Sequence, residues 1–475
     1  GNGPSGICLS FMLAGNWPYY TGEPHPADEM LTARLHFSTR SGKLECLSSG
    51  LEGRIGGRPL ALLMDQLQHP CVDAGLDVPS LLTWKSVDQH PEHKVIDHIV
   101  LGKGQPGGSW QSMDPNVLTI SLNRWMSLPD LDIRQWEMLI ESEQFRNTKI
   151  SVGTVAAYYK DYVRIKRLEQ YFRCETIVTS VRTVCDPDIN CQKKDYNWIV
   201  DGFDKQTGKP FRYRCKRVVL ATGTTDLSNQ LGIPGENSQP DWITHDLNKL
   251  ELRSIELEER QIINPILVIG AGLSAADAIM AARFRGIPVL HAFRDSSNEW
   301  NKPDDEKIRT IYDKLQGLPS SMYPEYHKVY EMMADGGTNY PLYRALPGYT
   351  LLGFTGNEND FNNTTGSEKQ PIVTFSDPDG CIHTFRVSTV AILIGYKPDL
   401  SYLKDNGIGL GKYSDKPIDG KSNPIDVDNF TYEVAKASKN GLYALGPLVG
   451  DNFVRYILGG AFAILVHILT TSTPT

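Results

Sequence analysis

The feature that most constrains the fold is the stretch "INPILVIGAGLSAADAIMAARFRGIPVLHAFR" at residues 263–294. An apolar run leads into a G-x-G-x-x-A turn formed by Gly270, Gly272 and Ala276. An alanine-rich segment follows, and then a second apolar run at 289–293. Strand, glycine turn, helix and strand in this order are typical of a dinucleotide-binding βαβ unit, which holds a pyrophosphate at the helix N-terminus.

A second glycine turn opens the chain as "GNGPSGICLS", with Gly1, Gly3 and Gly6 in the pattern G-x-G-x-x-G. The apolar segment 6–15 has the composition of a buried helix. No strand precedes the turn, and we expect it to lie before Gly1, outside the given sequence. Alone, the motif fits an ordinary glycine-rich loop as well as a phosphate-binding turn. The second copy near residue 270 favours phosphate binding.

Two other apolar runs have the pattern of strands in a parallel sheet that is covered on both faces. Arg217–Leu220 runs into Ala221, Thr222 and Gly223, and a similar run occupies Ser388–Asp399. Small residues at a strand end let the backbone pass close to a cofactor. We therefore predict an α/β protein with two Rossmann-like dinucleotide-binding domains.

Two such domains suggest two bound nucleotides, and a flavin with a nicotinamide hydride donor is the commonest pair. We predict an FAD-binding domain in two parts, residues 1–240 and 391–475. The NADPH-binding domain is expected as an insertion at 241–390.

Composition argues against several other classes of protein. The chain has 475 residues, a formal net charge of −8 and 40% hydrophobic residues, as in a soluble globular protein, and it lacks the basic excess typical of nucleic-acid binding. None of its eight cysteines forms C-x-x-C, so we expect no metal site, reduced thiols and no disulfide-reductase pair. The apolar run "GGAFAILVHIL" is expected to be a buried helix too short to span a bilayer.

The order of these motifs resembles the flavin-containing monooxygenases among two-dinucleotide-binding-domain flavoproteins. More closely, the chain resembles the oxidative stress-induced growth inhibitor family over nearly its whole length. The stretches that carry this resemblance are "GNGPSGICLS", "LSSGLEGR", "IVLGKGQPGGSW", "YPEYHKVYEMM" and "PLVGDNFVRYILGGA".

The resemblance implies which residues hold each cofactor. FAD would be held by the first glycine turn, the G-G-x-W segment, the A-T-G strand end and the Gly-Asp pair, that is by Gly1, Gly3, Pro4, Ser5, Gly6, Gly108, Trp110, Ala221, Thr222, Gly223, Gly450 and Asp451. NADPH would be held by the second turn and the strand end after it, that is by Gly270, Gly272, Ser274, Ala275 and Arg294.

Two of these residues also have plain structural readings. Trp110 could be a packed surface aromatic, although the glycines beside it favour a backbone close to a ligand. Asp451 could be an N-cap of the following helix, whose N-terminus would stabilise negative charge on a reduced flavin. Arg294 and nearby serines fit the 2′-phosphate of NADPH, although Asp295 is the kind of residue that binds a free ribose hydroxyl.

The chain also departs from the monooxygenase pattern. The predicted second strand ends in Gly102-Lys103, where an acidic residue usually meets the flavin ribose. The fingerprint F-x-G-x-x-x-H-x-x-x-Y is not intact, and Asn123 is only a loose match to the asparagine expected near the flavin.

The resemblance implies a monooxygenase in which NADPH reduces FAD and the reduced flavin reacts with oxygen and a small-molecule substrate. No catalytic side chain stands out, and we expect His245 and His291 to be structural. Two alternatives remain: an NADPH oxidase or reductase that releases hydrogen peroxide, and a regulator that restrains growth or promotes cell death through protein partners, with FAD kept for structure. We expect an intracellular location, cytoplasmic first and otherwise nuclear or mitochondrial.

Overall fold

The computed structural model describes residues 1–38, 58–71, 75–140, 148–184, 196–236, 241–261, 264–294, 315, 320, 323–355 and 371–472. The described chain forms two compact units. Unit 1 comprises Gly1–Leu227 and Lys397–Thr475, and unit 2 comprises Ser228–Tyr396. The sequence placed the corresponding boundaries at 240/241 and 390/391.

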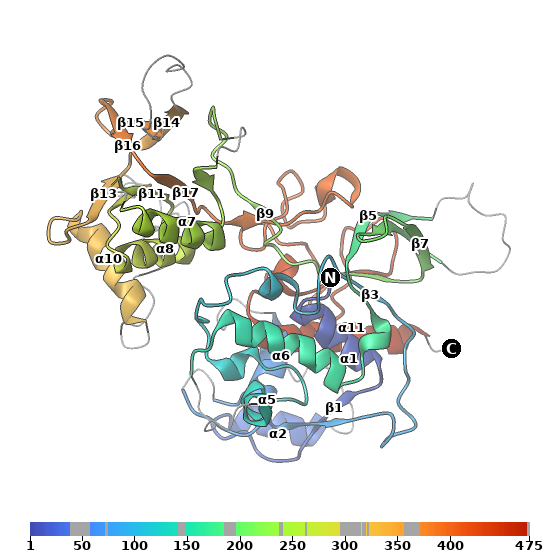
Figure 1. Ribbon diagram of the computed structural model, residues 1–475. Helices are drawn as coiled ribbons and strands as arrows, with labels where there is room; N and C mark the ends of the chain where they lie inside the picture. Colours follow the sequence, from blue (N-terminus) through green and yellow to red (C-terminus); the bar gives the residue numbers. More distant parts are fainter. Residues whose placement is uncertain are drawn as a thin grey trace. The chain divides into compact units, whose positions relative to one another are not determined.

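Unit 1 packs helices against short parallel strand pairs and a small antiparallel sheet (Figure 1). Its helices are α1 (Pro4–Leu13), α2 (Glu29–Ser38), α4 (Pro59–Gln68), α5 (Ile133–Ile140), α6 (Val152–Ile165) and α11 (Ile457–Ser472). Its strands are β1 (Trp17–Tyr20), β2 (Leu82–Lys85), β3 (Val100–Leu101), β4 (Phe172–Arg173), β5 (Thr176–Thr183), β6 (Trp198–Asp204), β7 (Pro210–Cys215), β8 (Val218–Leu220) and β19 (Leu442–Ala444). Strands β9 (Leu227–Ser228) and β18 (Tyr396–Lys397) straddle the unit boundaries.

Short 3-10 helices complete unit 1. They are η2 (Gly108–Gln111), η3 (Asn123–Met126), η4 (Glu169–Tyr171), η8 (Lys404–Gly407), η9 (Gly446–Val449) and η10 (Val454–Tyr456). Two of them, η2 and η9, lie within the segments that the sequence assigns to the flavin.

Helix α1 lies at the centre of unit 1 because it is apolar on every side: residues Ser5 to Leu13 are all buried. A helix of this kind needs protein on all its faces. Helices α1 and α11 pack together, and α11 also packs on α4 so closely that a Cβ atom on Gly459 would lie 2.5 Å from the Ala61 Cα. A glycine at this crossing lets the two backbones meet.

Unit 2 is built on a five-stranded sheet in the order β10-β17-β11-β12-β13, and every neighbouring pair in it is parallel. These strands are β10 (Ile243–Thr244), β11 (Ile266–Ile269), β12 (Val289–Phe293), β13 (Tyr343–Pro347) and β17 (Thr389–Ile392). The helices are α7 (Leu247–Glu259), α8 (Leu273–Phe284) and α10 (Pro324–Asp335). An antiparallel sheet of β14 (Thr350–Thr355), β15 (Ile372–Ser376) and β16 (Ile382–Arg386) packs on the parallel sheet through a shared apolar core.

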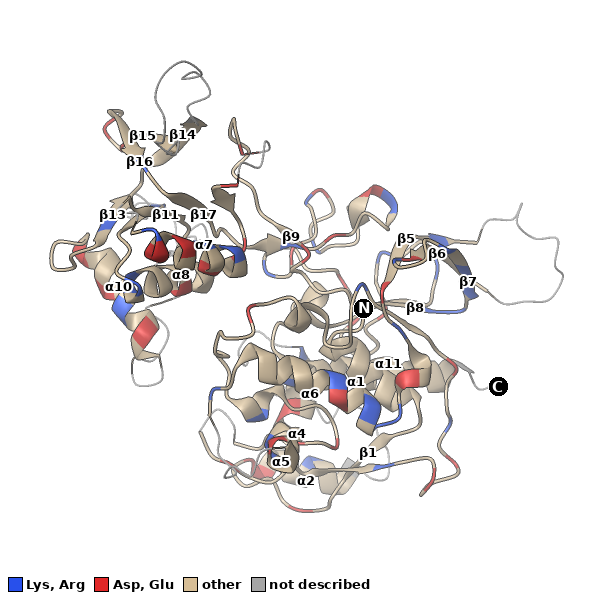
Figure 2. Cartoon of the chain, viewed as in Figure 1, with Lys and Arg blue, Asp and Glu red and all other residues tan. Residues whose placement is uncertain are grey.

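Charges of both signs are interspersed on the helices of unit 2 (Figure 2). Arg285, after α8, forms ion pairs with Glu251 and Glu258 of α7, and Arg253 pairs with Glu256 on the same helix. Such a mixed surface differs from the single-signed basic stripe of nucleic-acid-binding proteins.

The C-terminal helix is longer than the apolar run in the sequence suggested. Together with η10 it offers an 18-residue window, Val454–Thr471, that is apolar enough to cross a membrane by length and composition. In the fold, 61% of that window is buried, as in the core helix of a globular unit. The expectation that this run is too short to span a bilayer is therefore wrong. The expectation of a buried terminal helix is confirmed.

Candidate functional site

The start of α1 brings together four segments that are far apart in the sequence. A Cβ atom on Gly1 would lie 1.9 Å from the Ala221 carbonyl oxygen, and one on Gly6 would lie 2.0 Å from the Gly1 oxygen. A Cβ on Gly108 would lie 2.8 Å from the Gly3 Cα, so these two backbones touch. Glycine is required at Gly108 for a second reason, because its φ is +60°.

The helix start is arranged to receive an anion. Gly3 is the N-cap residue of α1 and has no side chain to satisfy the amides of the first turn. Pro4 occupies the first helical turn, where its missing N–H costs nothing. The remaining amides and the helix dipole favour a negative group at this point. The residues present therefore fit a dinucleotide pyrophosphate.

The Gly-Asp pair joins the same place through η9. A Cβ on Gly446 would lie 2.3 Å from the Ser5 hydroxyl oxygen, so the two segments are in contact. The Asp451 N–H donates to the Gly446 carbonyl at 3.2 Å. Gly450 has a φ of +94°, which a side chain would strain. The structure thus places Asp451 one short 3-10 helix away from the first glycine turn.

The Asp451 carboxyl is buried, with 3% of its surface exposed. The Tyr432 hydroxyl donates to its Oδ2 atom at 2.9 Å. Burial raises the pKa of Asp451 to about 6, against the opposing effects of the Arg58 charge and the Tyr432 hydrogen bond. Helix α11 begins only at Ile457, so the N-cap interpretation of Asp451 is wrong: its side chain turns inward to Tyr432.

The buried carboxyl at 451 is expected to lower stability near neutral pH. The folded state binds its proton more tightly than the unfolded state, so the stability that this proton contributes is lost as pH rises from about 4 to 6. Replacing Asp451 by Asn keeps a hydrogen-bond acceptor for Tyr432 and removes the titration. We expect Asp451→Asn to raise the free energy of unfolding at pH 7 by about 2 kcal/mol in dinucleotide-free protein, and to have no such effect below pH 4. Urea unfolding at both pH values checks this; an equal gain at both would contradict it.

Other predicted FAD residues have additional protein contacts. The Trp110 ring is half-buried and packs edge-on against Tyr159, with ring centroids 6.1 Å apart. The interpretation of Trp110 as a packed aromatic therefore holds for part of its surface. The Thr222 hydroxyl is 3.0 Å from the Tyr402 hydroxyl. Gly223 has a φ of +74°, and the residues that the structure describes leave the space within 4 Å of its Cβ position open. The role of each residue in holding FAD stays a prediction.

Asn2 is a residue of this site that the sequence reasoning missed. It is buried, its side-chain amide donates to the Gly104 carbonyl at 2.7 Å, and its own carbonyl accepts from Gly107 at 2.9 Å. A Cβ on Gly102 would lie 2.1 Å from the Asn2 side chain. Asn2 stands at an x position of the G-x-G-x-x-G pattern, which the motif leaves variable. The sequence signal that could have indicated this contact is Gly102, directly after β3, against which the Asn2 side chain lies.

The residue at the missing acidic position also has partners. The Lys103 ammonium lies 3.0 Å from an Asp226 carboxylate oxygen and 3.3 Å from one of Asp399. Two carboxylates therefore lie beside the end of β3, although neither comes from that strand.

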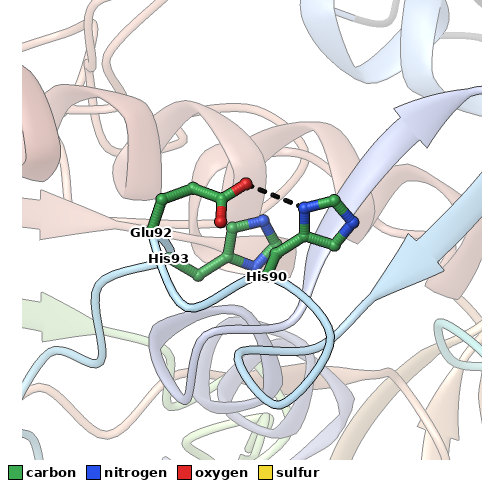
Figure 3. Close-up of side chains that lie close together, drawn as sticks. All are labelled: His90, Glu92 and His93. Carbon is green, nitrogen blue, oxygen red and sulfur yellow. Dashed lines mark hydrogen bonds and ion pairs between the residues drawn. The ribbon is translucent and has the colours of Figure 1, made fainter.

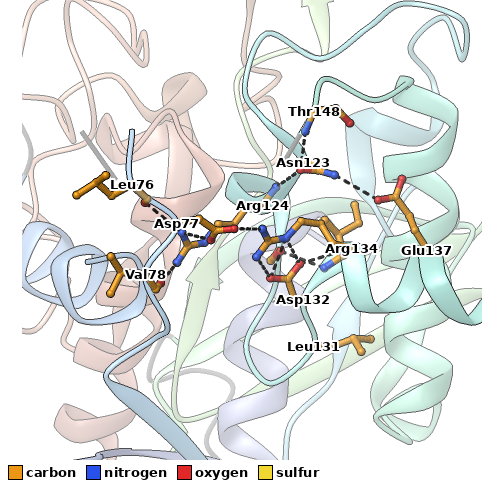
Figure 4. Close-up of polar contacts among 12 residues, drawn as sticks. Leu76, Asp77, Val78, Asn123, Arg124, Leu131, Asp132, Arg134, Glu137 and Thr148 are labelled. Carbon is orange, nitrogen blue, oxygen red and sulfur yellow. Dashed lines mark hydrogen bonds and ion pairs between the residues drawn. The ribbon is translucent and has the colours of Figure 1, made fainter. Parts of the chain in front are cut away.

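Asn123 is held by protein groups (Figure 4). Its Oδ1 atom accepts from the backbone N–H groups of Arg124 and Thr148, at 2.9 and 3.3 Å. Arg124 and Arg134 share Asp77, at 2.6 and 2.7 Å. This polar cluster stabilises the loop around 123–134 and gives Asn123 a structural role.

The second glycine turn lies in unit 2, between β11 and α8. Gly270 has a φ of +125°, and a Cβ there would lie 2.3 Å from the Leu393 oxygen. Gly272 is the N-cap of α8, and none of the described residues has an atom within 4 Å of a Cβ placed there. Gly270 is thus required by the fold, whereas Gly272 faces open space that a pyrophosphate can occupy.

The remaining predicted NADPH residues follow the expected order. Ala275 is buried in the first turn of α8, beside the half-buried Ser274. Arg294 is exposed directly after β12. Asp295 and the serines after it lie outside the described residues, as does the stretch "LSSGLEGR".

His291 of β12 contacts the backbone of the second turn and is fully buried. Its Nε2 atom lies 2.6 Å from the Gly270 carbonyl oxygen, and its Nδ1 atom lies 2.8 Å from the Tyr343 hydroxyl. Burial lowers the pKa of His291 to about 4. The neutral ring therefore donates from Nε2 to Gly270 and accepts at Nδ1 from Tyr343. His245, in contact with Glu236 at 3.1 Å, is likewise held by protein.

Removing the His291 imidazole is expected to destabilise unit 2. In His291→Leu the Gly270 carbonyl and the Tyr343 hydroxyl both lose a partner inside the core, at a cost of about 3 kcal/mol. Hydrogen exchange of the β11 and β12 amides measures this loss. His327→Leu, at a half-buried position of α10 outside the sheet, is the matched control and should change protection of the β11 and β12 amides by less than about 0.5 kcal/mol. Equal protection in His291→Leu and the unmodified protein would show that the ring does not support the turn.

Comparisons with known proteins agree with this architecture. No protein-family model matches the chain. It is 40% identical to human "Oxidative stress-induced growth inhibitor 1", over 100% of this chain and 94% of that protein. It is 36% identical to human "Oxidative stress-induced growth inhibitor 2", over 98% and 91%.

Solved structures share the fold at low identity. The bacillithiol disulfide reductase Bdr (YpdA) of Bacillus cereus matches with a TM-score of 0.54 and 18% identity, over 79% of this chain and 92% of that one. The FAD-bound cadaverine monooxygenase DfoA of Erwinia amylovora matches with a TM-score of 0.50 and 13% identity, over 86% and 92%. The predicted α/β fold with two dinucleotide-binding domains is confirmed. The chain belongs to the oxidative stress-induced growth inhibitor family.

Proposed function

We propose that the protein is an FAD-dependent, NADPH-using monooxygenase that restrains cell growth or promotes cell death under oxidative stress. The contact between the first glycine turn, Gly108, Ala221 and Gly446 at the uncapped start of α1 carries this proposal. Each contact depends on a missing side chain, and four such approaches at one helix start are the pattern of a backbone that receives a diphosphate.

When bound, FAD would supply two-electron redox chemistry with a hydride donor and with oxygen. The chain's own contribution in unit 1 is to bind and orient. The α1 amides would hold the pyrophosphate, the Gly107-Gly108 turn would contribute backbone beside it, and Asp451 in its ionised form would accept hydrogen bonds from hydroxyl groups of the cofactor. Tyr432 holds that carboxylate in place from the protein side.

In unit 2 the space beside Gly272 at the start of α8 would receive the NADPH pyrophosphate. Arg294 is exposed at the end of β12, where its guanidinium can bind a 2′-phosphate in a bidentate manner. His291 fixes the peptide that begins this turn. In this proposal no side chain is needed as a nucleophile.

The names of similar proteins support an oxidoreductase and leave two types open, a disulfide reductase and a monooxygenase. None of the eight cysteines forms the close C-x-x-C pair of a disulfide reductase, which favours the monooxygenase type. The names of the 40% and 36% identical relatives support the growth-restraining role. The partners are then a small-molecule substrate, oxygen and regulatory proteins, in an intracellular setting.

A visible absorption spectrum followed by anaerobic NADPH titration tests the proposal. We expect flavin bands, bleaching by NADPH, and NADPH consumption in air that requires a substrate. Consumption matched by hydrogen peroxide would instead favour the oxidase alternative. A protein that stays colourless after reconstitution with FAD would leave the non-catalytic regulator.

A further inference from the structure

Three side chains that the flavin chemistry does not use converge in the loop after β2 (Figure 3). His90, Glu92 and His93 each offer one ligand atom, and these atoms all lie within 4.8 Å of one another. The backbone builds the arrangement: the His90 N–H donates to Ser86 at 2.9 Å, and the His93 N–H donates to His90 at 2.9 Å. We propose that these three residues bind a divalent transition metal, with Zn²⁺ as the best match.

His93 is already oriented as a metal ligand. It is 4% exposed, and its ring stacks on Trp17 with centroids 4.2 Å apart. Its Nδ1–H donates to the Gly15 carbonyl at 2.9 Å, which leaves a lone pair on Nε2. Ligating histidines typically donate their second nitrogen to a carbonyl or carboxylate in this way. At present the Tyr19 hydroxyl donates to that lone pair at 2.7 Å.

His90 and Glu92 are the two more exposed members of the set. The His90 Nδ1 atom lies 2.8 Å from a Glu92 carboxylate oxygen, and its ring stacks on His93 with centroids 5.2 Å apart. Both side chains are partly exposed and can rotate toward the fixed His93 nitrogen.

The donor set selects the metal. Two imidazoles and one carboxylate with a position open to water are a common zinc set, whereas Ca²⁺ and Mg²⁺ prefer all-oxygen sites. Tetrahedral zinc brings ligand nitrogens to about 3.3 Å from each other, so atoms separated by the full 4.8 Å must approach by about 1.5 Å. Against binding stand the Tyr19 hydrogen bond and the Lys85 ammonium, 4.6 Å from the Tyr19 ring centroid.

Occupancy would connect this loop to the end of α1. His93 is bonded to Gly15, which directly follows the α1 C-cap residue Ala14, so a metal on His93 ties the loop to the helix that begins at the first glycine turn. Bound zinc should therefore raise the thermal midpoint of the full chain.

Zinc titration of the metal-free full chain, by calorimetry and by competition with a chromophoric chelator, tests the proposal. We expect His90→Gln and Glu92→Gln each to weaken binding at one site by about tenfold or more. Tyr19→Phe should tighten binding, because it removes the hydroxyl that competes for Nε2; a purely structural histidine stack does not predict this gain. His327→Gln is the control, since His327 faces Glu331 at 3.9 Å on α10.

The decisive result is the difference between these variants. A Co²⁺ spectrum without thiolate bands would support the His/Glu set over the cysteines. Zinc affinity unchanged in both His90→Gln and Glu92→Gln, or no zinc binding by the unmodified protein, would overturn the proposal. Circular dichroism of every variant shows whether it is folded before its affinity is compared.

Discussion

Gly272→Asp is expected to reduce the rate of NADPH-dependent flavin reduction by about 100-fold or more while leaving bound FAD in place. In the described part of the chain no atom lies within 4 Å of a Cβ at position 272, so we expect the fold to accept a side chain there. The aspartate carboxylate would instead occupy the space of the pyrophosphate and repel its charge. Stopped-flow reduction at increasing NADPH, together with flavin content from absorbance, measures both halves of this prediction.

Two control variants sharpen the result. Gly272→Ala should fold normally and show a smaller defect, because it adds bulk without charge. Gly6→Ala should give the opposite pattern, since its Cβ would lie 2.0 Å from the Gly1 oxygen and distort the first turn, so flavin is lost first. Loss of flavin in Gly272→Asp, with flavin retained in Gly6→Ala, would show that the two cofactors are assigned to the wrong turns.

Gly459→Leu is expected to destabilise unit 1 by about 3 kcal/mol or more, enough to lower the yield of soluble protein. The first side-chain atom at this position would lie 2.5 Å from both the Ala61 Cα and the Leu60 oxygen. These are backbone atoms of α4, so no rotamer change relieves the contact and the two helices must separate. Urea unfolding followed by tryptophan fluorescence measures the change.

Gly104→Ala is the matched control for that prediction. Its Cβ would have one neighbour, a Glu175 carboxylate oxygen at 3.9 Å, so we expect a change below about 1 kcal/mol. If Gly459→Leu unfolded at the same urea concentration as the control, the close crossing of α4 and α11 would not exist in solution.

The sequence predicted the second dinucleotide unit well because its local signals agree. The apolar runs became β11 and β12, the turn begins α8, and Gly286 follows the helix end. All of this is encoded within about thirty residues, so no long-range packing was needed to read it.

The first site was harder to predict because its parts come from distant segments. The motifs identified Gly108, Ala221 and Gly450, but nothing local announces that Gly446 touches Ser5 or that Asn2 fills the space beside Gly102. The same holds for the inward turn of Asp451. Its carboxyl accepts a hydrogen bond from Tyr432, 19 residues earlier, and interacts with the charge of Arg58, several hundred residues earlier. The nearby helix suggested an N-cap instead.

The zinc proposal shows a different limit. Cysteine spacing led to the expectation of no metal site, and the short segment containing His90 and His93 carries no familiar ligand signature. What suggests a site is the tautomer of His93, set by the carbonyl of Gly15 some eighty residues earlier.

The inward-facing carboxyl at position 451 gives a simple diagnostic for related chains. An ionisable group kept out of water burdens the folded state, and only a ligand that needs it compensates for that burden. In a relative that has lost its redox activity and kept only its binding partners, replacing this acid by a neutral residue would raise the free energy of unfolding. The residue at this position should therefore distinguish catalytically active relatives from relatives that have lost the activity.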